Sequence, residues 1–108
     1  MNPYSPIWLD SFVNELSQIT KYLIYNASSS VADQLVEAIK TQARKACSNP
    51  ELYPVFELEP DFRKMPIRNW RYVAFYTVEE QPRQIILTHI YHTSRDIHSI
   101  MQGLKEYL

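Results

Sequence analysis

The chain has 108 residues, enough for a single hydrophobic core, and we expect residues 1–108 to form one domain. Apolar residues make up 45% and charged residues 21%, and the net charge of −1 gives no overall electrostatic reason for binding nucleic acid or a membrane. The single Cys47 excludes an internal disulfide. The chain opens without a secretion signal, and no apolar run approaches the roughly 18 residues of a membrane span. We therefore expect a cytoplasmic protein.

Apolar residues at helical spacing predict two helices in the first half of the chain. Residues 4–9 contain a proline and are expected to form a short edge strand or an extended lead-in. A helix capped by Asp10 or Ser11 follows, and a second helix capped by Ser30 runs to Asn49-Pro50. The apolar face of the first helix consists of Phe12, Leu16, Ile19 and Leu23. Two amphipathic helices joined by a few residues predict an antiparallel helical hairpin whose apolar face packs on another layer.

Runs of β-branched and aromatic residues predict three strands in the second half, at Val55–Leu58, Trp70–Val78 and Ile85–His92. Between the first two, Pro60 and Pro66 bracket a segment that is typical of a turn. The last two strands form an antiparallel hairpin. Its turn, Glu79-Glu80-Gln81-Pro82, has no glycine, which favours a loop of four or five residues around a type I turn over the two-residue type that needs positive φ at its centre.

Strand periodicity gives neither strand of this hairpin a clean polar face, so both are expected to be central in a sheet. In the second strand one face would carry Ile85, Leu87, His89 and Tyr91. Thr93 or Ser94 can cap a last helix with an apolar side formed by Ile97, Ile100, Met101 and Leu104. The predicted fold class is therefore α+β: an N-terminal helical hairpin packed on a small antiparallel sheet of three to four strands, with a C-terminal helix.

Most common site chemistries find no support in the sequence. His89 and His92 would point to opposite faces of a strand, and no spacing of Cys, Asp or Glu completes a ligand set around them or around His98, so we expect no metal. Cys47 on a helix is expected to be buried filler. Gly103 is the only glycine, which excludes a glycine-rich phosphate loop, and we expect no cofactor.

Basic and aromatic residues gather at the ends of the predicted β-hairpin. Because its strands are antiparallel, Arg71 at the start of one should lie near the His92–Arg95 corner at the end of the other, close to Trp70, Tyr72 and Tyr91. Guanidinium groups among aromatic rings suit phosphate contacts and base stacking, whereas the alternative is a charged strand edge that prevents aggregation. The candidate target-binding residues are Arg63, Lys64, Arg68, Trp70, Arg71, His92 and Arg95.

The order of elements and several short motifs resemble the RelE/ParE superfamily of toxins from type II toxin–antitoxin systems. The resemblance covers nearly the whole chain. The motifs are Leu16-(x)2-Ile19-(x)2-Tyr22-Leu23, Asn69-Trp70, Phe75-Tyr76, Ile85-Ile86-Leu87 and His92-Thr93-Ser94-Arg95-Asp96. One departure is the longer spacing between the Asn-aromatic and Phe-Tyr motifs. The resemblance implies a toxin that inhibits growth, bound by a cognate antitoxin, and leaves open a homodimer or a toxin–antitoxin hetero-oligomer.

Two branches of the superfamily differ in their target. Members that cleave mRNA on the ribosome resemble one another in a basic charge, an Arg directly after the corner His and a Tyr a few residues later. This chain has Thr93 in the first place and Ile97 or His98 in the second, and its net charge is slightly negative. These departures favour the ParE-like branch, which poisons DNA gyrase and is not an enzyme. Two alternatives stay open: a non-toxic interaction module, and a ribonuclease with catalytic candidates Arg71, Tyr91, His92, Arg95 and His98.

Overall fold

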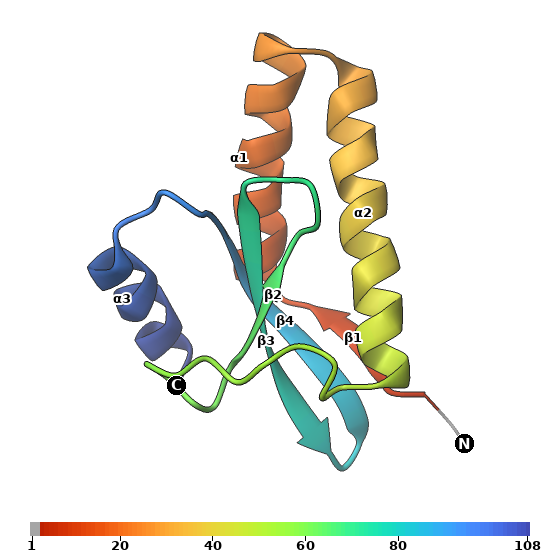
Figure 1. Ribbon diagram of the computed structural model, residues 1–108, viewed down its shortest axis with the longest axis vertical. Coiled ribbons are helices and arrows are strands. Elements are labelled where there is room, and N and C mark those ends of the chain that lie inside the picture. Colours follow the sequence, from red (N-terminus) through yellow and green to blue (C-terminus); the bar gives the residue numbers. More distant parts are fainter. Residues whose placement is uncertain (1–2) are drawn as a thin grey trace.

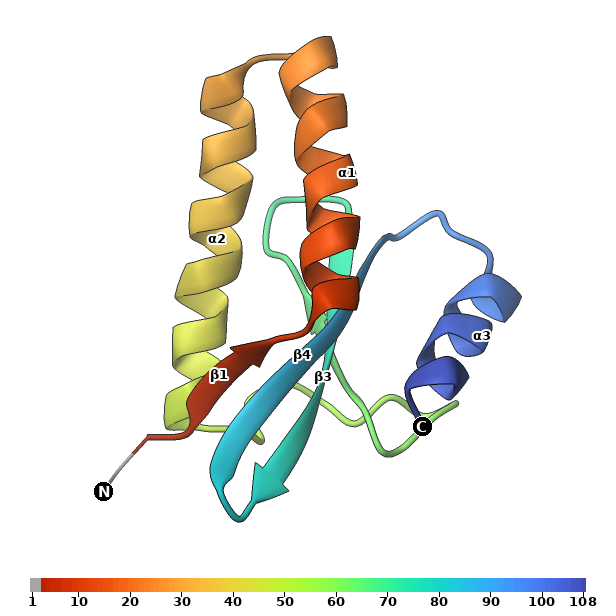
Figure 2. The same cartoon turned by 180° about the vertical axis from the view of Figure 1, so that it is seen from behind.

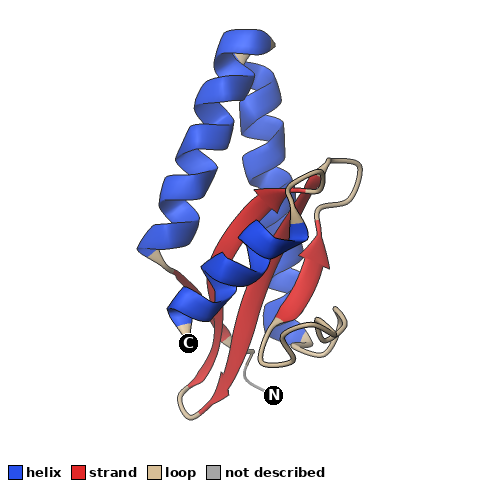
Figure 3. Cartoon of the chain, turned by 90° about the vertical axis from the view of Figure 1, so that its left-hand side faces the viewer, coloured by secondary structure: helices blue, strands red, loops and turns tan. Residues whose placement is uncertain are grey.

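The computed structural model describes residues 3–108 and contains three helices around a four-stranded sheet (Figure 1). The elements are β1 (Ser5–Trp8), α1 (Asp10–Asn26), α2 (Ser29–Ser48), β2 (Arg63–Pro66), β3 (Tyr72–Glu80), β4 (Arg83–His92) and α3 (Ile97–Tyr107). Helices α1 and α2 form an antiparallel hairpin on one face of the sheet, and α3 lies on the other face (Figure 3). The predicted α+β class is therefore confirmed.

The strand order in the sheet is β1-β4-β3-β2. Strands β2, β3 and β4 pair antiparallel, as expected, whereas β1 pairs parallel to β4, so that the sheet is mixed (Figure 2). The pairing continues past β1, because the backbone N–H of Leu9 donates to the carbonyl of Leu87 at 3.1 Å. Apolar alternation within a segment predicts a strand but not its direction, which long-range pairing determines.

The third antiparallel strand is not the predicted Val55–Leu58 but β2, inside the segment that the flanking prolines marked as a turn. Val55 makes only an isolated bridge to Arg63, and Leu58 is 55% exposed. Residues 54–62 instead fold back on themselves, with the N–H of Phe56 donating to the carbonyl of Phe62 at 2.8 Å. The difference lies in what each segment buries: β2 inserts the fully buried Met65 into the core beneath the helical hairpin, whereas the earlier segment buries Phe56 against Phe75 on the opposite face.

The β3–β4 turn is shorter than predicted. Glu80 pairs with Arg83, which leaves a two-residue loop of Gln81 and Pro82 joined by a cis peptide bond. Neither loop residue has a positive φ, so this two-residue turn needs no glycine. The absence of glycine therefore did not require a longer loop, and that prediction was wrong.

A β-bulge in β4 changes which side chains share a face. Phe75 pairs with His89 and Tyr76 with Leu87, so Thr88 is an extra residue, and its buried hydroxyl donates to the carbonyl of Phe75 at 3.1 Å. Leu87 therefore faces the helical hairpin, while His89 and Tyr91 face α3. The prediction that all three share one face was wrong because regular alternation does not survive an inserted residue.

Helix starts also differ from the predicted caps. The hydroxyl of Ser28, not Ser30, accepts from the N–H of Val31 at 3.1 Å and caps α2. Helix α1 has Leu9 at its N-cap without a side-chain bond, and Ser11 instead donates to the carbonyl of Thr88 at 2.6 Å. Helix α3 likewise has no side-chain cap at Asp96.

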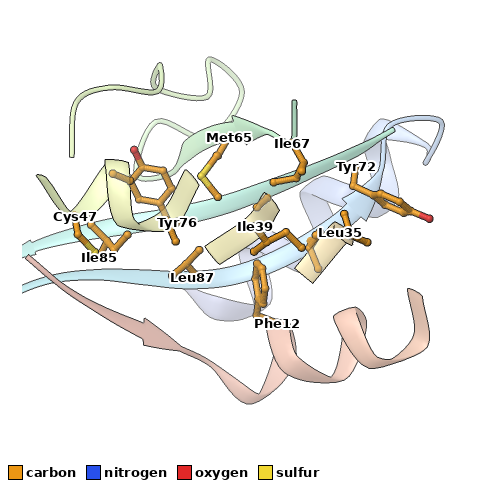
Figure 4. Close-up of a cluster of buried hydrophobic side chains, with 14 residues drawn as sticks. Phe12, Leu35, Ile39, Cys47, Met65, Ile67, Tyr72, Tyr76, Ile85 and Leu87 are labelled. Atoms are coloured by element: carbon orange, nitrogen blue, oxygen red, sulfur yellow. The ribbon is translucent and has the colours of Figure 1, made fainter. Parts of the chain in front are cut away.

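The main core lies between the helical hairpin and the sheet (Figure 4). Phe12 from α1 and Leu35 and Ile39 from α2 are at most 1% exposed and pack with side chains of the central strands. A second cluster fills the opposite face beneath α3, formed by Phe56, Phe62, Val73, Phe75, Tyr91, Ile100 and Leu104. In the part of the chain that the structure describes, no helix is long and apolar enough to span a membrane.

Candidate functional site

The start of β3 and the end of β4 meet at one corner of the sheet. Tyr72 pairs with His92, and the N–H of Thr93 donates to the carbonyl of Arg71 at 2.9 Å. Arg71 therefore lies beside the segment 92–95, as the antiparallel pairing predicts. We call the residues Arg71, His92, Thr93 and Arg95 the corner site.

The imidazole of His92 is held at the surface by its own turn. The backbone N–H of Ser94 donates to Nδ1 at 3.0 Å, and the Ser94 hydroxyl lies 2.7 Å from the same atom. The ring stands edge-on to Tyr72, with the centroids 5.4 Å apart. Because Nδ1 accepts from a backbone N–H, the ring proton of neutral His92 is on Nε2. In this arrangement His92 can donate a hydrogen bond but offers no free basic nitrogen.

Arg95 is positioned by a stack of side chains on the α3 face of the sheet. The His89 and Tyr91 rings are stacked, 5.4 Å apart with an interplanar angle of 16°, and the Arg95 guanidinium lies 4.4 Å from the Tyr91 centroid. Both carboxylate oxygens of Glu15 lie 3.1 Å from His89 Nδ1, and one also accepts from the N–H of Ile90 at 3.2 Å. Glu15 thereby ties α1 to the base of this stack.

Tyr91 is a structural element of the corner and a poor candidate for an acid–base group. Burial raises the pKa of its hydroxyl well above the ordinary range, and the nearby Glu15 carboxylate raises the pKa further. Its Oη abuts Gly103 in α3, where a Cβ atom would overlap the hydroxyl. The only glycine of the chain therefore stands where α3 packs on Tyr91.

Arg95 borders three hollows in the surface. The first, which we call the sheet hollow, has a volume of about 370 Å³ and an apolar floor that includes Val73 and Phe75. Lys64 lines it as well, with its Nζ 5.8 Å from the Phe56 ring centroid. No carboxylate of the described chain lines this hollow, so its charge is positive.

The second, the α1 hollow, has a volume of about 390 Å³ and lies between α1 and the end of β4. Its lining comprises Glu15, Gln18, Ile19, Tyr22, Tyr72, Ile90, Tyr91, His92 and Arg95. The third lies between α1 and α3 and includes the exposed His98. Within residues 3–108, no three side chains of His, Cys, Asp or Glu come together in a way that could hold a metal ion.

The predicted target-binding residues fall into separate places. Lys64, Arg71, His92 and Arg95 lie around the corner site and the sheet hollow. Arg63 lies further along β2, where it pairs with Tyr76, and its guanidinium donates to the carbonyl of Tyr53 at 2.9 Å.

The remaining two candidates face the helical hairpin. Arg68 lines a hollow along α2, and its backbone N–H donates to the side-chain oxygen of Gln42 at 2.8 Å. Trp70 packs against the main core. Charge runs in the sequence did not reveal this division, because β2 and the loop after it distribute neighbouring residues over different faces.

Sequence reasoning missed the contribution of α1. Glu15, Gln18 and Tyr22 recur at helical spacing and share one flank of the helix, which borders the corner. The sequence feature that could have indicated this flank is the polar residue Glu15, which lies beside the apolar face of the first helix.

Comparisons with known proteins agree with this architecture. A family model described as ParE toxin of type II toxin–antitoxin system, parDE, matches residues 7–97. A solved structure of the chromosomal ParDE system from P. aeruginosa is 19% identical, with a TM-score of 0.70, and the match covers 82% of this chain and 95% of that one. No curated protein sequence matches significantly.

Two further structures share the fold. A mutant of the E. coli toxin RelE in the free state is 15% identical, with a TM-score of 0.68 over 98% of this chain and 99% of that one. The toxin–antitoxin complex RelBE2 from Mycobacterium tuberculosis is 13% identical, with a TM-score of 0.58 over 85% and 93%. These likenesses concern the fold, while the family model spans most of the sequence. The chain belongs to the ParE toxin family of type II toxin–antitoxin systems.

Proposed function

We propose that this toxin arrests growth by binding DNA gyrase at the corner site, without catalysing a reaction, and that a cognate antitoxin neutralises it. The toxin would act in the cytoplasm, where gyrase works on the chromosome. Membership of the ParE family supports the choice of target.

The observation that carries the proposal is the state of the acid–base groups at the corner. Nδ1 of His92 is engaged by Ser94, and burial raises the pKa of the Tyr91 hydroxyl, which makes it a weaker proton donor. Thr93 and Ile97 line the sheet hollow. The resemblance implies that cleaving members of the superfamily carry Arg in place of Thr93 and Tyr in place of Ile97 or His98. What remains is a cationic and apolar surface, which suits binding to a protein better than proton transfer.

A second candidate function is cleavage of mRNA on the ribosome. One observation favours it: Lys64 and Arg95 converge on the sheet hollow, where two cations could hold a phosphate. A base for the 2′-hydroxyl would still be needed, and His92 could serve only after its contact with Ser94 breaks.

The test is a purified supercoiling assay with the wild-type chain, Arg95→Ala and the matched control Arg44→Ala. Arg44 is exposed on α2, far from the corner in the sequence. We expect the wild type and the control to block supercoiling by gyrase, and Arg95→Ala to lose at least tenfold in potency, since a desolvated contact is typically worth about 1.4 kcal/mol or more.

A parallel assay measures cleavage of mRNA at the ribosomal A site. Cleavage with supercoiling untouched would reject the gyrase proposal in favour of the ribonuclease, with His92 and Lys64 as the next residues to replace. Inactivity in both assays, together with unimpaired growth on expression, would support a non-toxic interaction module.

A further inference from the structure

Glu15 makes contacts that go beyond what the attachment of α1 to the sheet requires. The helix is already anchored by Phe12, which is fully buried, and by Ser11, whose hydroxyl donates to the carbonyl of Thr88 at 2.6 Å. A partly buried contact between a carboxylate and an imidazole adds little stability, because the loss of hydration offsets much of the attraction. The contact of Glu15 with His89 therefore points to a role other than holding the helix in place.

The Glu15 carboxylate fixes the plane of the His89 ring. Both of its oxygens lie 3.1 Å from Nδ1, and one of them also accepts from the backbone N–H of Ile90 at 3.2 Å. Because a carboxylate only accepts, Nδ1 carries the proton of this contact. The Tyr91 ring lies within 16° of parallel to the His89 ring, so the orientation of one sets that of the other. The Arg95 guanidinium lies over the second of these rings.

The Glu15 carboxylate is also placed to compete for Arg95. The two side chains line the same two hollows, the α1 hollow and the one between α1 and α3, whereas Glu106 lines only the latter. Besides burial, which raises the pKa of the Tyr91 hydroxyl most, the Glu15 carboxylate raises this pKa and Arg95 lowers it, so both charges lie near one hydroxyl. Among residues 3–108, however, no carboxylate oxygen lies within 4.0 Å of the Arg95 guanidinium. His89 engages the carboxylate instead, which leaves the guanidinium free.

We propose that Glu15 and His89 are positioning residues for Arg95. Their contact fixes the Tyr91 ring over which the guanidinium lies, and it keeps the Glu15 carboxylate from pairing with that guanidinium. This inference rests on the proposed function, in which Arg95 contacts gyrase. It adds that recognition of the target depends on two side chains that need not touch the target themselves; His89 is only 8% exposed.

The competition is tested by His89→Phe, which keeps an aromatic ring beside Tyr91 but has no nitrogen for Glu15. The released carboxylate would pair with Arg95 and mask it, so potency in the supercoiling assay should fall by about three- to tenfold, as expected for the loss of a charged contact. Adding Glu15→Gln to this variant removes the competing charge and should recover most of the loss. A pair that served only to stabilise the fold would not give this pattern in proteins that are equally folded.

Two further comparisons link the effect to Arg95. In a chain that already carries Arg95→Ala, His89→Phe should cause no further loss of potency, because the cation that Glu15 would mask is gone. Glu37→Gln is the matched control, since it removes a carboxylate from the other helix of the hairpin. Glu37 is exposed and contacts Lys40, so its replacement should leave potency within about twofold.

The position of Arg95 is measured by NMR in the free toxin, so that this part of the test does not depend on gyrase. In the wild type, the ring current of Tyr91 should shift the Arg95 Cδ protons upfield, and the heteronuclear NOE of Nε should indicate an ordered side chain. Glu15→Ala should reduce both effects. Glu15→Gln should reduce them less, because its amide oxygen can still accept from the N–H groups of His89 and Ile90. Circular dichroism and urea denaturation establish that each variant is folded.

Unchanged potency of His89→Phe, or a loss that Glu15→Gln does not recover, would overturn this inference. A loss that persists in the Arg95→Ala background, or an Arg95 side chain as ordered in Glu15→Ala as in the wild type, would overturn it as well. All these outcomes leave the gyrase proposal intact, since they compare variants with a wild type that blocks supercoiling. A wild type that leaves supercoiling unaffected would reject the proposed function, while the NMR series would still decide whether Glu15 and His89 position Arg95.

Discussion

The contact between Tyr91 and Gly103 predicts a strong dependence of one position on the other. A Cβ atom on Gly103 would overlap Tyr91 Oη, and the next closest atom is Cζ of the same ring, at 3.3 Å. Tyr91 is 3% exposed and stacked against His89, so its ring has little room to retreat. Gly103→Ala therefore forces α3 away from the sheet or the ring out of its place.

The expected magnitude combines two opposing effects. Overpacking of a filled site costs about 1–3 kcal/mol, and an overlap with a confined ring belongs near the top of this range. Alanine in place of glycine inside a helix stabilises the folded state by about 1 kcal/mol. We therefore expect Gly103→Ala to lower the free energy of unfolding by about 2 kcal/mol. In the Tyr91→Phe background the hydroxyl is gone and Cζ needs to shift only slightly, so the same replacement should be neutral or stabilising by up to about 1 kcal/mol.

The assay is urea denaturation of the four proteins of this double-mutant cycle, followed by the fluorescence of Trp8 and Trp70. The coupling free energy should be about 2–3 kcal/mol, with similar m-values throughout. Gln102→Ala, next to the glycine on α3 and exposed, serves as the control and should change stability by less than about 0.5 kcal/mol. Additivity of the two replacements within about 0.5 kcal/mol would refute the packing argument.

Two further predictions concern the core. Ile39→Ala should cost about 2–5 kcal/mol in urea denaturation because Ile39 is 1% exposed, whereas Val13→Ala, at a 49% exposed position of α1, should cost less than about 0.5 kcal/mol; a loss that small for Ile39 would contradict its place in the core. Burial raises the pKa of Tyr76 from 10.0 to about 12, so the unfolded chain releases this proton first, and stability that is complete below pH 10 should fall as the pH rises towards 12. Tyr76→Phe should flatten this decline, and an unchanged slope in denaturation series across this range would contradict the argument.

Local patterns in the sequence predicted the helices, the two central strands and the α+β class. The apolar face of α1 and the buried side of α2 follow the helical period, and the long runs of β-branched and aromatic residues became β3 and β4. The same patterns could not predict what depends on partners distant in the sequence. The parallel direction of β1, and the pairing of β2 in place of residues 55–58, depend on contacts with distant parts of the chain. The local sequence of a segment does not specify these contacts.

The candidate site was predicted in the same uneven way. The meeting of Arg71 with residues 92–95 follows from the antiparallel pairing of two strands that the sequence predicts, so this part of the corner site was predictable. The inserted Thr88 was not, and it decides that His89 and Tyr91 stack on the α3 face. The single inserted residue therefore determines which face carries the two stacked rings on which Arg95 lies.

Arg95 owes its position to contacts that reach across the whole domain. Glu15 fixes His89 from α1, His89 stacks on Tyr91 from within β4, and Gly103 admits the Tyr91 hydroxyl from α3. An exposed arginine would ordinarily sample many rotamers and lose that freedom on binding. Because its guanidinium already lies over a ring that two helices hold in place, part of this entropic cost is met during folding. In the proposed function, a chain with a net charge of −1 would therefore present Arg95 to its target as a pre-positioned cation.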